Sequence, residues 1–314
     1  MFTSFLIFIV AFAALVRSGS ILVRSLSALS RILGISEYAT AFILMAGATS
    51  LPELFIGISS AFSGFPELSL GNVLGANFLN ITLVLGAVAI IGNGLTVREP
   101  VRSEDVRMIF VLTVIPFLLA LDGAFGRVDG IIMIVLFIGY LLELFEESRE
   151  RESLMMAHAS LRSPVSGFGG HAAAFIGGIV LMLVSAYFVV YSGTRLAGAL
   201  ELSSFLFGVV LLSLGSTLPE LVFGVRSALL KEGALGLGNV IGSVVFNTLF
   251  ILGVVAVIHP IVFPDRAAVL QGFVSVSLLI LFVQALTYLK GSISRRVGVF
   301  LLILYVVFLI YQLV

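Results

Sequence analysis

Apolar residues fill the chain in runs of about 17–27 residues, separated by short polar or Gly/Pro-rich breaks. A helix needs ~20 apolar residues to cross ~30 Å of hydrocarbon. The pattern therefore predicts an all-α integral membrane protein with ten transmembrane helices. These spans are expected at residues 2–25, 37–63, 68–91, 104–121, 129–145, 172–194, 204–229, 235–258, 267–289 and 296–313.

Composition supports this class. The 314 residues are 60% hydrophobic and only 11% charged, whereas soluble domains carry roughly 25% charged residues. A formal net charge of zero gives no indication of nucleic-acid binding, and the lack of cysteine excludes disulfides and thiolate metal sites. The three histidines are too scattered for a zinc site. The apolar run Met1–Val16 follows no basic residue, so we expect a first transmembrane helix rather than a signal peptide.

The basic residues are distributed unevenly between the spans. Of the 17 Lys and Arg residues, 14 lie in the connections after odd-numbered spans, and only Arg127, Arg195 and Arg266 lie in the even ones. Because cytoplasmic loops carry the Lys/Arg excess, both termini are predicted to be extracellular, in a multi-pass protein of the cell (inner) membrane.

An internal repeat appears when the sequence is shifted by 167 residues. From Leu51 to Gly86, 16 of 36 positions are then identical without a gap, and glutamate, proline and asparagine align as well as apolar residues. The motif "LPEL" at 51–54 returns at 218–221, and "GNV" at 71–73 returns at 238–240. Apolar composition alone would not align these polar positions.

Each copy holds five predicted spans, and an odd number places the second copy upside down relative to the first. We expect two inverted five-helix repeats, residues 1–145 and 171–314, joined by a cytoplasmic linker at 146–170. Inverted repeats are typical of secondary transporters, whose substrate site lies near mid-membrane between the repeats.

Each LPEL motif places a proline beside a glutamate inside an apolar run. Pro52 has no N–H for the carbonyl of Ala48, and Pro219 has none for the carbonyl of Gly215. A cation would satisfy such a carbonyl in the membrane. An ionisable residue within a span indicates a functional site, so Glu53 and Glu220 are the primary candidates.

Other oxygen-bearing side chains recur on the same helical faces. The spacing places hydroxyls beside each glutamate and amides along the following helix. The two sets are Thr49, Ser50, Asn72 and Asn80 in the first half, and Ser216, Thr217, Asn239, Ser243 and Asn247 in the second. Oxygen ligands suit hard cations such as Ca²⁺. Two neighbouring buried glutamates repel and would otherwise bind protons. A divalent cation neutralises both, which suggests exchange of Ca²⁺ for Na⁺ or H⁺.

The segments "TSLPEL" (49–54) with "GNVLGANFLN" (71–80), and "STLPEL" (216–221) with "GNVIGSVVFN" (238–247), resemble the two alpha repeats of the calcium/cation antiporter superfamily, specifically the prokaryotic sodium/calcium exchangers. The resemblance implies ten helices, a four-helix core formed by spans 2, 3, 7 and 8, and sliding of spans 1 and 6 during transport. It also implies a calcium site made by Glu53, Glu220 and backbone oxygens near Thr49 and Ser216. Flanking sodium sites would involve Ala46, Ser50, Ser213, Thr217 and Ser243.

Three positions depart from the family pattern. Ala76 stands where that pattern has a serine, the order Ser216-Thr217 is inverted, and Asn247 stands where some exchangers carry an aspartate. The alanine affects the expected sodium stoichiometry more than calcium binding.

The sequence thus predicts a Na⁺/Ca²⁺ antiporter, with a Ca²⁺/H⁺ antiporter using the same glutamates as the alternative. A channel would require a continuous pore, usually lined by several subunits. An intramembrane enzyme would require a nucleophile and base pair, which the repeated hydroxyls do not form. We expect no enzymatic activity, no cofactor and no obligatory protein partner.

Overall fold

The computed structural model describes residues 2–33, 47, 49–96, 103–155, 168–231 and 233–313. The described chain is almost entirely helical. Its helices are α1 (Phe2–Leu33), α3 (Leu51–Phe62), α4 (Pro66–Leu79), η2 (Asn80–Val84), α5 (Leu85–Ile91), α6 (Ser103–Leu119), η3 (Ala120–Asp122), α7 (Arg127–Met155), α8 (Phe168–Ala199), α9 (Ser204–Phe207), η4 (Gly208–Leu212), α10 (Ser213–Ser216), α11 (Leu218–Leu229), α12 (Gly233–Val245), η5 (Phe246–Ile251), α13 (Leu252–Ile258), α14 (Arg266–Lys290) and α15 (Arg295–Leu313).

Secondary-structure elements recur with the same 167-residue shift as the sequence. Helix α3 maps onto α11 and α5 maps onto α13, residue for residue. The π-helical turn η2 maps into η5, so both halves widen the helix at the same point of the repeat. Short π-helical segments often mark functional sites.

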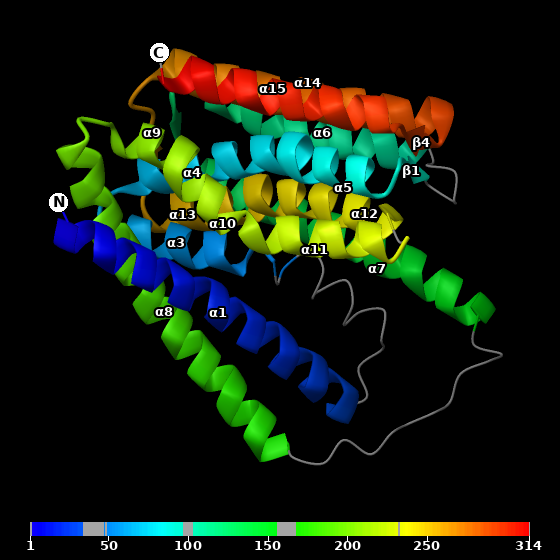
Figure 1. The fold of residues 1–314 in the computed structure, drawn as a ribbon, viewed down its shortest axis with the longest axis horizontal. Helices are drawn as coiled ribbons and strands as arrows, with labels where there is room; N and C mark the ends of the chain where they lie inside the picture. Colours follow the sequence, from blue (N-terminus) through cyan, green and yellow to red (C-terminus); the bar gives the residue numbers. More distant parts are fainter. Residues whose placement is uncertain are drawn as a thin grey trace.

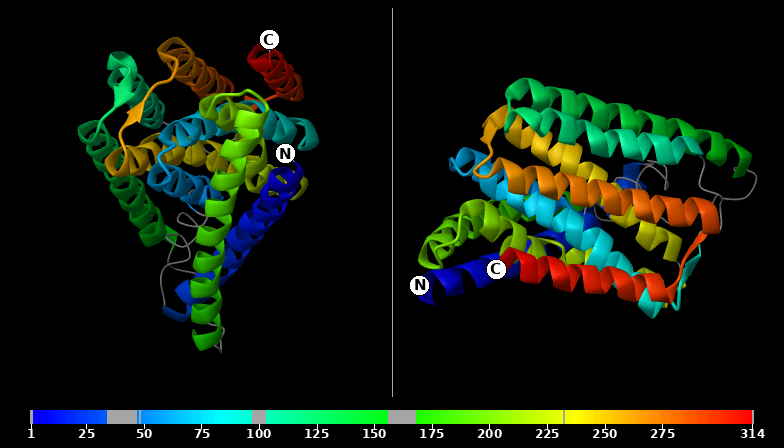
Figure 2. Two further views of the ribbon diagram at one scale, coloured as in Figure 1. Left: turned by 90° about the vertical axis from the view of Figure 1, so that its left-hand side faces the viewer. Right: turned by 90° about the horizontal axis from the view of Figure 1, so that it is seen from above.

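The two copies of the central helix lie inside the molecule. In the most apolar 18 residues of the stretches 66–91 (α4, η2, α5) and 236–258 (α12, η5, α13), 78% and 72% of the residues are buried, against 33% in those of α1 and α8. Helices α1 and α8 pack along one another and extend away from the rest of the bundle (Figures 1 and 2). Their outer faces expose side chains such as Phe5, Val10 and Ile176, as expected for helices in contact with lipid.

Two short antiparallel ribbons connect the halves. Strand β1 (Leu95–Thr96) pairs with β4 (Ser292–Ile293), and β2 (Ala124–Phe125) pairs with β3 (Ile261–Val262). Each ribbon takes one strand from each half. The two pairings are equivalent because the 167-residue shift carries one ribbon approximately onto the other.

Glycines allow close contact between α4 and the helices at 204–212. A Cβ at Gly71 would overlap the carbonyl oxygen of Phe205, and one at Gly75 would overlap that of Val209. In return, a Cβ at Gly208 would lie 2.5 Å from the Leu68 carbonyl oxygen. Backbones can approach this closely only where side chains are missing, so these glycines bring the two halves into direct contact.

The helix boundaries differ from the sequence expectation at several ends. Helix α1 continues to Leu33, α8 spans 168–199, and α7 continues through Met155 into the predicted 146–170 linker. Polar residues extend these helices because backbone hydrogen bonding does not require an apolar surface. In the described residues, five helices are long and apolar enough to span a membrane, and a sixth arises if the bent pair 204–216 and 218–229 counts as one span. The number of ten spans stays a prediction.

Candidate cation-binding site

The LPEL motifs begin new helices. Helix α3 starts at Leu51 and α11 at Leu218, so Pro52 and Pro219 each occupy the first turn, where a missing N–H breaks no helical hydrogen bond. The chain bends by 41° between Ser204–Ser216 and Leu218–Leu229, so the expected seventh span is broken at its LPEL motif. The Thr217 N–H donates to the Ser213 carbonyl (3.0 Å), and a free Gly215 carbonyl stays a prediction. Ala48, whose carbonyl was the other candidate, lies outside the described residues.

The helix starts place two carboxylates inside the protein. Glu53 and Glu220 lie in the first turns of α3 and α11 and are both completely buried. The two groups are close enough to interact electrostatically. Ser50 donates a hydrogen bond of 3.3 Å to Oε1 of Glu220, whereas within the described part of the chain Oε2 of Glu220 and both oxygens of Glu53 have no hydrogen-bond partner. The described residues provide neither carboxylate with a cationic neighbour.

Hydrogen bonds between the halves surround the glutamates with a repeated pattern. The Thr49 hydroxyl donates to Oδ1 of Asn239 (3.3 Å), and its counterpart Ser216 donates to Oδ1 of Asn72 (3.1 Å). The shift of 167 residues exchanges these two bonds. Thr49 also lies 3.4 Å from the Ser243 hydroxyl. Donors and acceptors from opposite halves therefore meet around one centre.

The remaining candidate residues fall into three groups. Ser213 and Thr217 are buried, and their hydroxyls donate to backbone carbonyls of their own helical segment, Val209 (2.5 Å) and Ser213 (2.7 Å). Their oxygen lone pairs remain able to accept a cation. Asn80 and Asn247 are buried in η2 and η5, and both polar atoms of Asn80 have no partner. Ala46 lies outside the described residues.

Two polar residues at this site were not predicted. Nδ2 of Asn77 donates to Oγ1 of Thr248 (2.7 Å), and Nδ2 of Asn247 donates to Oδ1 of Asn77 (3.1 Å). Asn77 and Thr248 are missed because the repeat pairs them with Val244 and Ile81, which are apolar. A search for polar residues present in both halves cannot find them. Helical spacing does offer a signal, since Asn77 lies in the turn before Asn80.

The arrangement is a cluster of oxygen atoms with two acidic groups. Among the described residues, no group of three or more His, Cys, Asp or Glu side chains forms a metal site. Two carboxylates match the charge of one divalent cation, and neutral hydroxyl and amide oxygens complete the shell that hard cations prefer. Burying unpaired carboxylates is costly, so the site is suited to a positively charged occupant.

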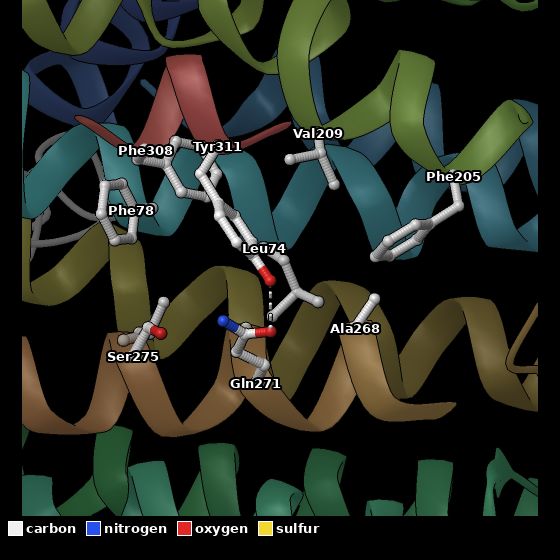
Figure 3. Close-up of a pocket in the computed structure, with 11 residues that line it drawn as sticks. Leu74, Phe78, Phe205, Val209, Ala268, Gln271, Ser275, Phe308 and Tyr311 are labelled. Carbon is white, nitrogen blue, oxygen red and sulfur yellow. Dashed lines mark hydrogen bonds between the residues drawn. The ribbon is translucent and has the colours of Figure 1, made fainter. Parts of the chain in front are cut away.

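A cavity of about 100 Å³ lies elsewhere, between α4, α9, α14 and α15. Its walls are mostly apolar, and Tyr311 donates a hydrogen bond of 3.3 Å to Gln271 at its edge (Figure 3). None of the candidate ligands lines it. This cavity is therefore separate from the carboxylate cluster.

The fold and the buried oxygen cluster define an all-α membrane protein of the cation-exchanger class. Residues 3–145 and 170–314 match the family described as "Sodium/calcium exchanger protein", and the chain belongs to that family. It is 28% identical to "Inner membrane protein YrbG" of Escherichia coli (strain K12), over 80% of this chain and 79% of that protein.

Two solved structures share the architecture. The sodium-calcium exchanger NCX_Mj soaked with Na⁺ and Ca²⁺ superposes with a TM-score of 0.64 at 25% identity, covering 97% of both chains. The H⁺/Ca²⁺ exchanger CAX superposes with a TM-score of 0.77 at 18% identity, covering 98% of this chain and 82% of that one. The second likeness concerns the fold alone. The chain is thus a membrane cation exchanger of the sodium/calcium exchanger family.

Proposed function

We propose that this protein exchanges Ca²⁺ for Na⁺ across the membrane by alternating access, with the ions bound between Glu53 and Glu220 near mid-membrane. One observation carries the proposal. Two completely buried glutamates, one from each half, interact with one another, while three of their four oxygens have no hydrogen-bond partner among the residues that the structure describes. A dehydrated Ca²⁺ would supply the charge that this centre lacks.

The neutral oxygens give the proposed sodium sites. We assign the sodium sites to the buried hydroxyls of Ser50, Ser213, Thr217 and Ser243, and Ala46 would contribute its backbone carbonyl. Na⁺ ions at these positions would neutralise the carboxylates after Ca²⁺ leaves. Competition for the same negative charges would couple the two fluxes. Asn80 and Asn247 would complete the shell through their amide oxygens.

Radioactive Ca²⁺ uptake into proteoliposomes tests the proposal. Vesicles loaded with Na⁺ should accumulate ⁴⁵Ca²⁺, and vesicles loaded with K⁺ or choline should not. Clamping the pH gradient to zero should leave the uptake unchanged. Uptake that ignores internal Na⁺ would reject sodium coupling, and no Ca²⁺ flux under any gradient would reject calcium exchange altogether.

Proton coupling is the second candidate. Ala76 removes a hydroxyl from a flanking site, and the fold resembles that of an H⁺/Ca²⁺ exchanger. The same glutamates would then carry protons in place of Na⁺. In the uptake experiment, this candidate requires Ca²⁺ entry that follows an imposed pH gradient without Na⁺.

The organisation of the chain in the membrane is also a proposal. We place residues 1–145 and 171–314 in two inverted halves joined by a cytoplasmic linker, with both termini extracellular in the cell (inner) membrane. The uneven distribution of Lys and Arg supports this orientation. Both termini lie at the same end of the molecule (Figures 1 and 2), as an even number of spans requires. We also propose that exchange needs no obligatory protein partner and no cofactor, because one chain supplies both glutamates.

A further inference from the structure

We propose that Asn77 and Thr248 are positioning residues that fix the side-chain amide of Asn247, so that its carbonyl oxygen and not its NH₂ group is presented to the transported cation. The inference rests on the proposed cation site between Glu53 and Glu220. It assigns a role to two residues whose counterparts in the internal repeat are apolar.

A chain of hydrogen bonds sets the direction of each group. The Thr248 hydroxyl has one proton, and it donates this proton to the carbonyl of Val244 (2.7 Å). Toward Asn77 the Thr248 oxygen can therefore only accept, so Asn77 must turn its NH₂ to Thr248 (2.7 Å). This leaves the Asn77 carbonyl facing Asn247, whose NH₂ donates to it (3.1 Å).

The chain ends at an unpaired atom. Oδ1 of Asn247 is buried and has no hydrogen-bond partner in the described residues. Because the NH₂ group of Asn247 is occupied by Asn77, the atom left to a ligand is an oxygen. Its helical segment η5 packs against both α3, which carries Glu53, and α4. A neutral oxygen held in this way is a cation ligand that needs no reorientation.

The other half offers no such support. Asn80 is the counterpart of Asn247, yet both of its polar atoms have no partner. The counterparts of Asn77 and Thr248 are Val244 and Ile81, which cannot hydrogen bond through their side chains. Asn80 is therefore free to rotate its amide where Asn247 is fixed. Asn80 and Asn247 occupy equivalent positions of the repeat, but we infer that only Asn247 presents a fixed oxygen to the cation.

The test measures the concentration dependence of ⁴⁵Ca²⁺ uptake in proteoliposomes. Thr248→Val removes the acceptor that orients Asn77, and it should raise KM for Ca²⁺ about two- to tenfold, the range for one buried hydrogen bond, with little change in the maximal rate. Thr248→Ser should restore KM. Thr248→Ala serves the same purpose if the valine variant does not fold.

Thr82→Val is the matched control. Thr82 is buried in η2 and donates to the Phe78 carbonyl (2.6 Å), as Thr248 does to Val244. No described asparagine is oriented by it. The control should leave KM unchanged, and an equal shift from Thr82→Val and Thr248→Val would overturn the proposal in favour of a general helix-stabilising role.

A double-mutant cycle gives a sharper outcome. Asn247→Asp replaces the NH₂ group by a second oxygen, which would face the Asn77 carbonyl. Asn77 can turn its NH₂ toward the new carboxylate only by giving up Thr248. Thr248→Val should therefore raise KM in the native background and lower it, or leave it unchanged, in the Asn247→Asp background. Additive effects would contradict the orienting role, whereas a native chain without Ca²⁺ flux would instead reject the proposed function.

Discussion

Glu53 and Glu220 concentrate the negative charge of the site on two buried side chains. Glu53→Gln or Glu220→Gln keeps the shape and removes one charge of the pair. We expect either variant to lose Ca²⁺ transport by at least about 100-fold, since removing one charge from a buried ion-binding pair costs several kcal/mol. The measurement is ⁴⁵Ca²⁺ uptake in proteoliposomes.

Glu143→Gln provides the control for this pair because Glu143 is exposed on α7. It should retain uptake, and all three variants should elute as monodisperse protein on size-exclusion chromatography. Retained Ca²⁺ exchange in both Glu53→Gln and Glu220→Gln would show that the site has been assigned to the wrong residues.

Ser50 donates a hydrogen bond of 3.3 Å to Oε1 of Glu220. Ser50→Ala should raise the KM for Ca²⁺ by about two- to tenfold, because the Glu220 carboxylate then lacks its orienting donor. Ser63→Ala, at an exposed position just after α3, is the comparison. Equal KM values for the two variants would contradict an orienting role for Ser50.

At the scale of single residues, the sequence predicts those site residues that occur in both halves of the repeat. Glu53 with Glu220 and Thr49 with Ser216 are buried or partly buried around a common centre, because a paired function selects the same chemistry in both halves. Asn77 and Thr248 escape prediction because their counterparts in the repeat, Val244 and Ile81, are apolar, so their hydrogen bonds have no equivalent elsewhere in the repeat.

At the scale of elements, helix packing depends on glycines that bring backbones together. Gly75→Ala would place a Cβ against the Val209 carbonyl and 2.6 Å from the Ser213 hydroxyl oxygen. Overpacking of this kind typically costs about 1–3 kcal/mol, so we expect a Tm several degrees lower. Gly177→Ala on α8, where an added Cβ meets no atom within 4 Å in the described part of the chain, should leave Tm unchanged. A thermal-shift assay in detergent compares them, and equal Tm values would contradict the close contact.

The order of the helices follows from hydropathy, but their ends do not. The apolar pattern locates the cores of α4–α5, α8 and α12–α13, since only apolar surface is stable in lipid. It misses the polar last turns of α1 and α7, which continue beyond the apolar stretch. It also predicts a single span at residues 204–229, whereas α11 begins as a new helix at a 41° bend. Pro in a first turn and Pro in a kink look alike in sequence.

At the scale of the whole molecule, the proposed orientation can be tested directly because the chain contains no cysteine. Single cysteines introduced as Phe2→Cys and Leu313→Cys should react with an impermeant maleimide added to intact cells. A cysteine in the cytoplasmic linker, such as Ser153→Cys, should react only after the membrane is permeabilised. The opposite pattern would invert the proposed topology.

The ribbons β1–β4 and β2–β3 have a consequence for the origin of the chain. Each pairs a strand of one half with a strand of the other, and the repeat approximately exchanges the two ribbons. Contacts of this kind are isologous, as in a twofold homodimer whose subunits bury the same surface. Two identical five-helix ancestors, inserted in opposite directions, could have formed both ribbons without any linker. Their fusion into one chain would then have allowed the halves to diverge, and the hydrogen bonds of Asn77, Thr248 and Asn247 show such divergence, because the counterparts Val244 and Ile81 cannot form them a second time.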